Sequence, residues 1–153
     1  MGKIRFSWKN IKWILIMLPF YGRRFSRKTK RFDVIDLKNH NFFFNQINFK
    51  NTKSKLNKLN RNSNLEIGFG KGENVIFQSQ IHKNDFFFAI DPFISGLIKL
   101  RKEIEIFKIS NIFFSNVPFS QFFEIASDLN FKKIFILFPD PWHKKKHKKR
   151  RLI

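Results

Sequence analysis

Three alternate glycines mark the stretch Leu65-Glu66-Ile67-Gly68-Phe69-Gly70-Lys71-Gly72, and this stretch decides the fold. A short apolar run leads into the glycines, and an amphipathic pattern starts directly behind them. Glycine allows a sharp backbone turn and lets a ligand approach main-chain N–H groups that a Cβ would obstruct. The stretch therefore predicts a strand, a tight loop and a helix, with a ligand at the loop. A tight glycine turn that binds nothing is the alternative.

Short apolar runs and amphipathic stretches alternate from Asn64 onward. This pattern is typical of β-α-β units, in which crossover helices join parallel strands. Strands are predicted at 65–69, 86–90, 112–114 and 134–138, and helices at 73–81, 92–105 and 119–129. Four strands with three crossover helices make half of a doubly wound α/β domain with a parallel sheet. The run 134–138 would be an exposed apolar edge, which is prone to pair with other chains.

Charge is unevenly distributed along the 153 residues, which hold 31 Lys and Arg against 11 Asp and Glu, a formal net charge of +20. Residues 63–138 hold 8 of each sign, whereas residues 1–62 hold 16 basic and 2 acidic side chains and residues 139–153 hold 7 and 1. We therefore expect a basic, partly ordered N-terminal extension at 1–62 and a globular α/β domain from 63 to 153. Two cationic flanks predict a polyanionic partner, RNA or DNA before an anionic membrane.

Absent features exclude several classes of protein. The sequence has no cysteine, so disulfides and thiolate metal sites are excluded, and a reducing cytoplasm is the expected location. The apolar run 13–20 is too short for a membrane span, which takes about 20 apolar residues. No metal is expected either, because the histidines show no ligand spacing with Asp or Glu. These histidines are His40, His82, His143 and His147.

A carboxylate follows the second predicted strand. Asp91 stands 23 positions after Gly68, near the spacing of about 20 residues at which an acidic residue binds the ribose hydroxyls of a nucleotide-like ligand. Asp91-Pro92 is equally well a helix cap. NAD is disfavoured, because its loop fingerprint needs glycine where this chain has Glu73. Glu66 favours a ligand that carries positive charge.

A second carboxylate follows the fourth predicted strand, in the motif Phe138-Pro139-Asp140-Pro141-Trp142. This position is at the carboxyl ends of the strands, where open α/β sheets bind ligands. The flanking prolines restrict the backbone of Asp140, and Trp142 supplies a flat apolar surface. The Lys and Arg residues from Lys144 onward can bind phosphates. A solvated basic tail is the alternative, but it leaves the Pro-Asp-Pro-Trp motif unexplained.

With the glycine stretch, Ile90-Asp91 and residues 138–153, the sequence resembles the bacterial tRNA (guanine-N7-)-methyltransferases. Tyr21-Gly22-Arg23-Arg24 is also similar to the basic entry segment of that family. The resemblance implies a Rossmann-like class I methyltransferase fold, S-adenosyl-L-methionine as cofactor and tRNA as partner. It implies that Asp140 is catalytic and that the cofactor is bound by Glu66, Gly68, Gly70, Asp91, Asn116 and Asp140. The substrate-binding residues that it implies are Lys144, Lys146, Lys148, Lys149, Arg150 and Arg151.

Two departures from the family qualify this expectation. The family has an acidic or amide residue near the adenine after the third strand, whereas this chain reads Ser115-Asn116-Val117-Pro118, so Asn116 is expected to substitute. The family also continues through further strands beyond Ile153. We therefore expect a methyltransferase domain that is incomplete at its C-terminus and weakly active or inactive by itself. The rival hypotheses are a non-catalytic RNA-binding remnant, and a cationic nucleic-acid-binding protein whose glycine loop is accidental.

Overall fold

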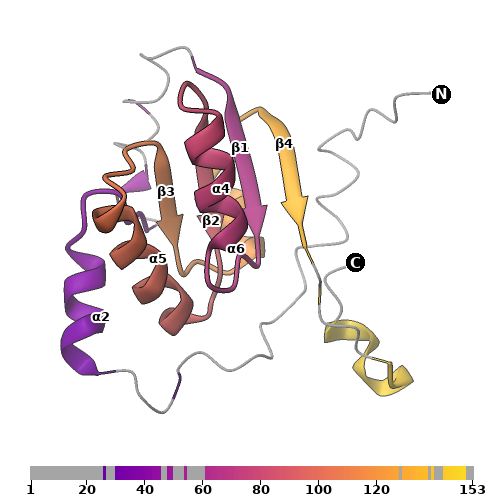
Figure 1. Cartoon of the computed structure of the whole chain (residues 1–153). Coiled ribbons are helices and arrows are strands. Elements are labelled where there is room, and N and C mark those ends of the chain that lie inside the picture. The colour runs from indigo at the N-terminus through magenta and orange to yellow at the C-terminus, as the bar shows by residue number, and fades with distance from the viewer. Residues whose placement is uncertain are drawn as a thin grey trace.

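The computed structural model describes residues 26, 30–45, 48–49, 54, 61–127, 129–137, 139 and 143–150. Its centre is a parallel sheet with the strand order β3-β2-β1-β4, shown in Figure 1 with its covering helices. The strands are β1 (Ser63–Ile67), β2 (Phe86–Ile90), β3 (Ile112–Ser115) and β4 (Phe131–Ile136). The helices are α2 (Arg31–Lys38), α4 (Glu73–Ile81), α5 (Ile94–Ile106), α6 (Phe119–Ile125) and the 3-10 helix η1 (Lys145–Arg150).

The predicted α/β fold with a parallel sheet is confirmed. The bounds of β2 and α4 are those predicted from the sequence. The other elements are displaced by a few residues: β1 begins at Ser63 and β4 at Phe131, and α6 ends at Ile125. The order β3-β2-β1-β4 changes direction between β1 and β4, which is the switch point at which doubly wound sheets bind ligands.

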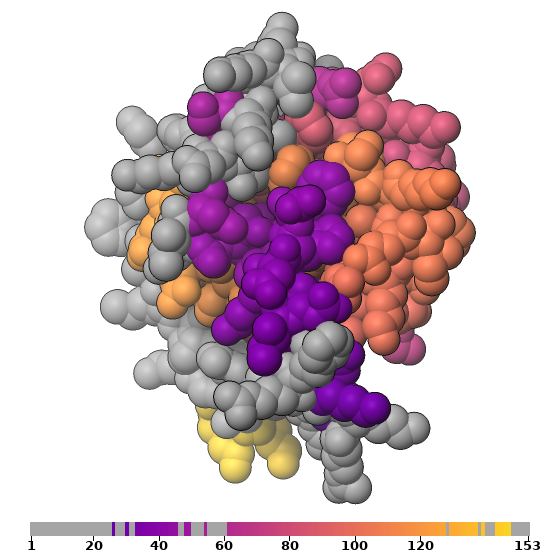
Figure 2. All heavy atoms as spheres, turned by 90° about the vertical axis from the view of Figure 1, so that its left-hand side faces the viewer, coloured from indigo at the N-terminus to yellow at the C-terminus, as the bar shows by residue number. Residues whose placement is uncertain are grey.

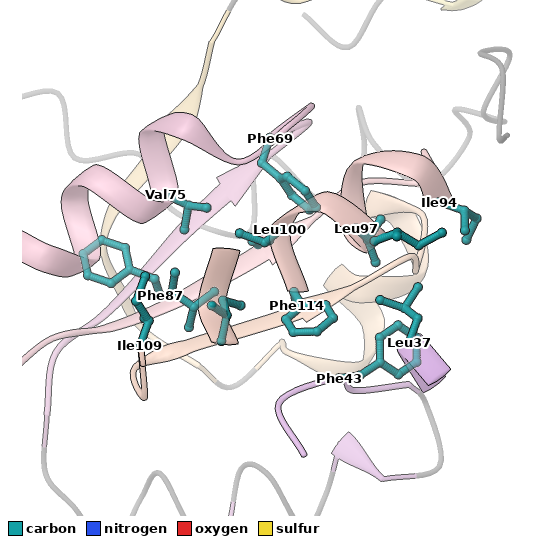
Figure 3. Close-up of a cluster of buried hydrophobic side chains, with 14 residues drawn as sticks. Leu37, Phe43, Phe69, Val75, Phe87, Ile94, Leu97, Leu100, Ile109 and Phe114 are labelled. Atoms are coloured by element: carbon teal, nitrogen blue, oxygen red, sulfur yellow. The ribbon is translucent and has the colours of Figure 1, made fainter. Parts of the chain in front are cut away.

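Two apolar cores lie on the two faces of the sheet. Alternate side chains of a strand point to opposite faces, so Phe87 and Ala89 of β2 join one core and Phe86 and Phe88 join the other. Helices α2, α4 and α5 cover the first core, where Leu37, Phe43 and Phe114 meet the leucines of α5 in Figure 3. Helix α6 covers the second core. Strands β1, β2 and β3 are thus covered on both faces, as the class requires.

The N-terminal extension contributes to both cores. The backbone N–H of Phe44 donates to the carbonyl oxygen of Phe114 at 3.0 Å, and the N–H of Phe114 donates to the carbonyl oxygen of Phe42 at 3.0 Å. Residues 42–44 therefore continue the sheet beyond β3 as a short parallel pairing. Phe43 is buried in the core under α5 and Phe44 in the core under α6.

Helix α2 holds the extension against α5. Arg101 of α5 forms ion pairs with Asp36 of α2 and with Glu105, and its side chain is largely buried between the two helices. Figure 2 shows residues 30–45 lying across this side of the molecule, against α5 and β3. Helix α2 of the extension therefore packs on the α/β domain.

A polar network closes the amino ends of the strands, opposite the glycine loop. The side-chain amide of Asn111, which is 6% exposed, donates to the carbonyl oxygens of Ser79, His82 and Asp85 at 2.9–3.3 Å. The carboxylate of Asp85 accepts hydrogen bonds from the amides of Asn62 and Asn64. These bonds tie the end of α4 to the start of β2. None of the residues that form them was predicted to bind a ligand.

Strand β4 is an edge of the sheet in the described part of the chain, where it pairs with β1. Its outer residues are poorly covered: Ile134 and the following Leu137 are each 41% exposed. Lys132 and Lys133 are exposed beside them. Lysines on an edge strand oppose its pairing with another chain, so Lys132 and Lys133 counteract the self-association predicted for this edge. That self-association stays a prediction.

Candidate functional site

The carboxyl ends of three neighbouring strands bring the predicted cofactor residues together. The register pairs Ile67 of β1 with Ile90 of β2, and Ile90 with Ser115 of β3. Glu66 stands one residue before the end of β1, and Asp91 and Asn116 follow β2 and β3 directly. The three predicted residues therefore share one edge of the sheet, as parallel strands require.

The glycine loop between β1 and α4 adopts the backbone conformation that its sequence predicts. Gly68, Gly70 and Gly72 have φ angles of +73°, +61° and +89°, in the left-handed region that other L residues rarely adopt. A Cβ at Gly68 or Gly70 would meet no atom within 4 Å. These two glycines thus border open space, so their backbone is accessible to a ligand.

A fourth glycine, Gly96, sets the position of this loop. A Cβ at Gly96 would lie 1.9 Å from the carbonyl oxygen of Gly70, far closer than a carbon and a non-bonded oxygen can approach. Helix α5 and the glycine loop therefore touch backbone to backbone. This role of Gly96 is not predicted from the sequence; the available signal is an isolated glycine inside a predicted helix, which usually has a packing reason.

Glu66 is a buried carboxyl group beside the loop. Its residue is 3% exposed, and its Oε2 accepts a hydrogen bond of 2.8 Å from the side-chain amide of Asn74 on α4. Burial raises the pKa of Glu66 to about 7, and the negative charges of Asp91 and Glu73 add to the rise, while the Asn74 hydrogen bond opposes it. A bound cation would favour the ionised form, so the site suits a positively charged ligand.

The raised pKa of Glu66 makes stability depend on pH. In the unfolded chain the group ionises near 4.5 and in the folded chain near 7, so between these values folding requires the carboxyl to hold its proton. The ligand-free protein should therefore lose up to about 3 kcal/mol as pH rises through this window. Glu66→Gln keeps an acceptor for Asn74 and cannot ionise. Urea unfolding should show that Glu66→Gln stabilises the protein more at pH 8 than at pH 5. An equal effect at both pH values would contradict a raised pKa for Glu66.

Asp91 is fixed by two backbone N–H groups. Its Oδ2 accepts a hydrogen bond of 2.8 Å from Gly70 in the loop, and its Oδ1 accepts one of 2.8 Å from Phe93 at the start of α5. The N-cap residue of α5 is Phe93, and no side chain forms a cap hydrogen bond there. Asp91 thus holds the backbone just before the helix, and the helix-cap interpretation is not confirmed. A carboxylate has about four lone-pair sites, more than these two bonds use. The bond to Gly70 also orients the loop.

The remaining predicted residues differ in how far the structure describes them. Asn116 is half-buried directly after β3, where an adenine contact was expected. Asp140 and Arg151 lie outside the described residues. Helix η1 carries Lys146, Lys148, Lys149 and Arg150 and lies beyond the carboxyl end of β4 in Figure 1. Lys144 and Lys146 are exposed.

Two kinds of feature are absent from the part of the chain that the structure describes. No group of three or more His, Cys, Asp or Glu side chains among them is arranged to hold a metal ion. Likewise, none of the helices that the structure describes has the length and apolar character of a membrane span.

The parallel sheet with flanking helices and a glycine loop at its switch point defines a Rossmann-like domain. A family model described as "putative methyltransferase" matches residues 60–153, more than half of the chain. The chain therefore belongs to this methyltransferase family.

Curated relatives carry the name tRNA (guanine-N(7)-)-methyltransferase. The one from Wolbachia pipientis wMel is 32% identical over 148 residues, covering 95% of this chain and 61% of the relative. The one from Neorickettsia sennetsu is 29% identical, covering 89% of this chain and 58% of the relative. A third, from Caulobacter vibrioides, is 34% identical over 89 residues. The chain spans about three fifths of the length of the first two relatives.

Proposed function

We propose that this chain takes part in methyl transfer from S-adenosylmethionine to N7 of a guanine in tRNA, in a cytoplasmic setting. The observation that carries the proposal is the convergence of Glu66, the open glycine loop and Asp91 at one sheet edge in a member of a methyltransferase family. The tRNA substrate and the guanine N7 position are those named for the relatives from Wolbachia and Neorickettsia.

The described residues fit S-adenosylmethionine. Glu66 is buried with a raised pKa, so it would gain from the positive charge of the methionine moiety. Gly68 and Gly70 border open space where the ligand would lie against the loop backbone without meeting a Cβ. Asp91 would accept the ribose hydroxyls, and Asn116, after β3, would lie by the adenine. When bound, the cofactor supplies an electrophilic methyl group.

The acceptor atom, N7 of guanine, is unprotonated on the Hoogsteen edge. No strong base is therefore needed, and the protein's task is to align the base and to stabilise the positive charge that appears on it. We assign this charge stabilisation to Asp140, which follows β4 in sequence. Lys144, Lys146, Lys148, Lys149, Arg150 and Arg151 would bind tRNA phosphates.

Neutralising Lys148, Lys149, Arg150 and Arg151 should weaken tRNA binding and flatten its salt dependence. Each lost phosphate contact removes roughly 0.7 to 0.9 from the slope of log affinity against log salt. Asp140→Ala should leave the slope unchanged, because a carboxylate neutralises no phosphate and so releases no counterions from the RNA. Binding titrations with unmodified tRNA at several salt concentrations measure the affinity and the slope. A wild-type slope in the four-site variant would show that these four residues do not contact RNA phosphates.

Cofactor binding tests the proposal, with two aspartates at opposite ends of β2 as a matched pair. Asp91→Ala should weaken S-adenosylmethionine binding by roughly 1–3 kcal/mol through unmade hydrogen bonds. Asp85→Ala removes the partner of Asn62 and Asn64 at the far end of the strand, so it should lower stability but not cofactor affinity. Calorimetry on the folded proteins gives the affinities.

Transfer of labelled methyl to unmodified tRNA completes the test. Binding of tRNA without any saturable cofactor binding would identify the chain as an RNA-binding remnant. Equal cofactor affinity in Asp91→Ala and wild type would refute the ribose role.

A further inference from the structure

Glu66 has apolar neighbours on both flanking strands. The register places it beside Ala89 of β2 and Phe135 of β4, and neither side chain can donate a hydrogen bond. Both neighbours belong to the apolar core on that face of the sheet. Two negative charges, those of Asp91 and Glu73, also act on Glu66. Its ionised form is therefore disfavoured unless a hydrogen-bond donor compensates for the lost hydration.

The side chain of Asn74 supplies such a donor. Its amide donates to Glu66 Oε2 at 2.8 Å. Gly72 directs the chain into this contact: its left-handed φ of +89° ends the loop, and α4 starts at the next residue. The first turn of α4 thereby brings Asn74 back to the end of β1. This hydrogen bond lowers the pKa of Glu66, whereas burial and the two like charges raise it.

We propose that Asn74 is a positioning residue of the cofactor site, whose amide stabilises the ionised form of the buried Glu66 carboxyl, the form that attracts the cationic moiety of the cofactor. This proposal rests on the proposed function, in which the cofactor is S-adenosylmethionine. Without the donor, the carboxyl would keep its proton at neutral pH and would offer a cation no opposite charge. The cofactor would then bind only the fraction of molecules in which Glu66 is ionised, and its apparent affinity would fall by that fraction.

Asn74→Ala should weaken S-adenosylmethionine binding roughly fivefold at pH 7 and less than about 1.5-fold at pH 9. The pKa of Glu66 is about 7 with Asn74 in place, and losing one hydrogen bond to the ionised form should move this titration up by roughly one pH unit. The ionised fraction at pH 7 then falls from about a half to about a tenth, whereas at pH 9 both proteins are mostly ionised. Calorimetry measures the affinities. Their ratio cancels the titration of the ligand's own amino group, which affects both proteins equally.

Two further variants separate the charge of Glu66 from the shape of the site. Gln78→Ala is the matched control, since Gln78 is a half-buried amide one turn further along α4, and it should leave the affinity unchanged at both pH values. Asn74→Asp keeps the shape of the side chain but replaces the donor with a carboxylate, so it should weaken binding at pH 7 more than Asn74→Ala does.

A Glu66→Gln background completes the cycle, because glutamine cannot ionise. There Asn74→Ala should have no pH-dependent effect on affinity. An effect that persists in this background would overturn the proposal. So would an equal weakening at pH 7 and pH 9, which would mark a purely structural role, and so would wild-type affinity at both pH values.

Urea unfolding without cofactor gives an independent readout. Stability falls as pH rises from 4.5 toward 7, because the folded chain keeps a proton on Glu66 that the unfolded chain releases. In Asn74→Ala this fall should continue roughly one pH unit higher; an identical pH profile in the two proteins would overturn the proposal. Wild-type protein that binds no S-adenosylmethionine at any pH would instead refute the proposed methyl transfer, and the unfolding profiles would still show whether Asn74 controls the ionisation of Glu66.

Discussion

Replacing Phe44 with alanine is expected to destabilise the protein by about 3–5 kcal/mol, the range for deleting a large aromatic side chain from a core. Phe44 is fully buried, and its ring contacts Phe49, Phe88 and Phe122 at centroid distances of 5.3–5.9 Å. The loss combines apolar surface returned to water with a cavity between α6 and the sheet. Urea unfolding followed by circular dichroism measures it.

Phe107→Ala is the control for this prediction. Phe107 is 52% exposed at the end of α5, so its removal should change the free energy of unfolding by less than about 1 kcal/mol. If Phe44→Ala cost no more than Phe107→Ala, residues 42–44 would not be part of the core, and the extension would be a loose arm after all.

Gly96→Ala should destabilise the protein by about 3 kcal/mol and reduce S-adenosylmethionine affinity at least tenfold. Helix propensity alone predicts that Gly96→Ala stabilises the protein, since alanine is better than glycine inside a helix by about 1 kcal/mol. Contact decides the outcome here, because the new Cβ would lie 1.9 Å from the carbonyl oxygen of Gly70. The loop or α5 must move, and overpacking of this kind costs about 1–3 kcal/mol or more. A shifted loop also moves the N–H of Gly70 away from Asp91.

Gly68→Ala separates loop displacement from loop strain. A Cβ at Gly68 meets nothing within 4 Å, but its φ of +73° strains any other residue, so a cost of about 1 kcal/mol is expected. Thermal unfolding and calorimetry on both variants give the comparison. A Gly96→Ala protein that is as stable as wild type and binds the cofactor normally would show that the loop can move freely away from α5.

The sequence predicted which residues meet at the carboxyl ends of the strands. Glu66 and Asp91 came from their places near the ends of apolar runs, Asn116 came from the family resemblance, and parallel strands bring these positions together. Their roles in cofactor binding stay predictions. For Asp91 the structure shows hydrogen bonds from the backbone of Gly70 and Phe93, and its ribose role stays a prediction. The role of Asp140 stays a prediction, because that residue lies outside the described part of the chain.

The sequence predicted less where a contact joins distant segments. The Phe42-Phe43-Phe44 run has neither a helical nor an alternating period that would place one residue on each face of a sheet. Its pairing with β3 depends on an edge that the strand pattern alone does not reveal. Gly96 was missed for the same reason: its importance comes from the backbone of Gly70, which approaches it only in the folded chain.

The pairing of residues 42–44 with β3 also bears on the order of events during synthesis. The phenylalanines leave the ribosome long before Phe114, their partner in the sheet, has been made. Contacts of such long sequence separation form late and slow the folding of a chain. Until then an aromatic triplet is exposed to solvent, a condition that promotes aggregation of incomplete chains. The surrounding positive charge gives the nascent segment mutual repulsion, and so a means of staying dispersed until its edge of the sheet exists.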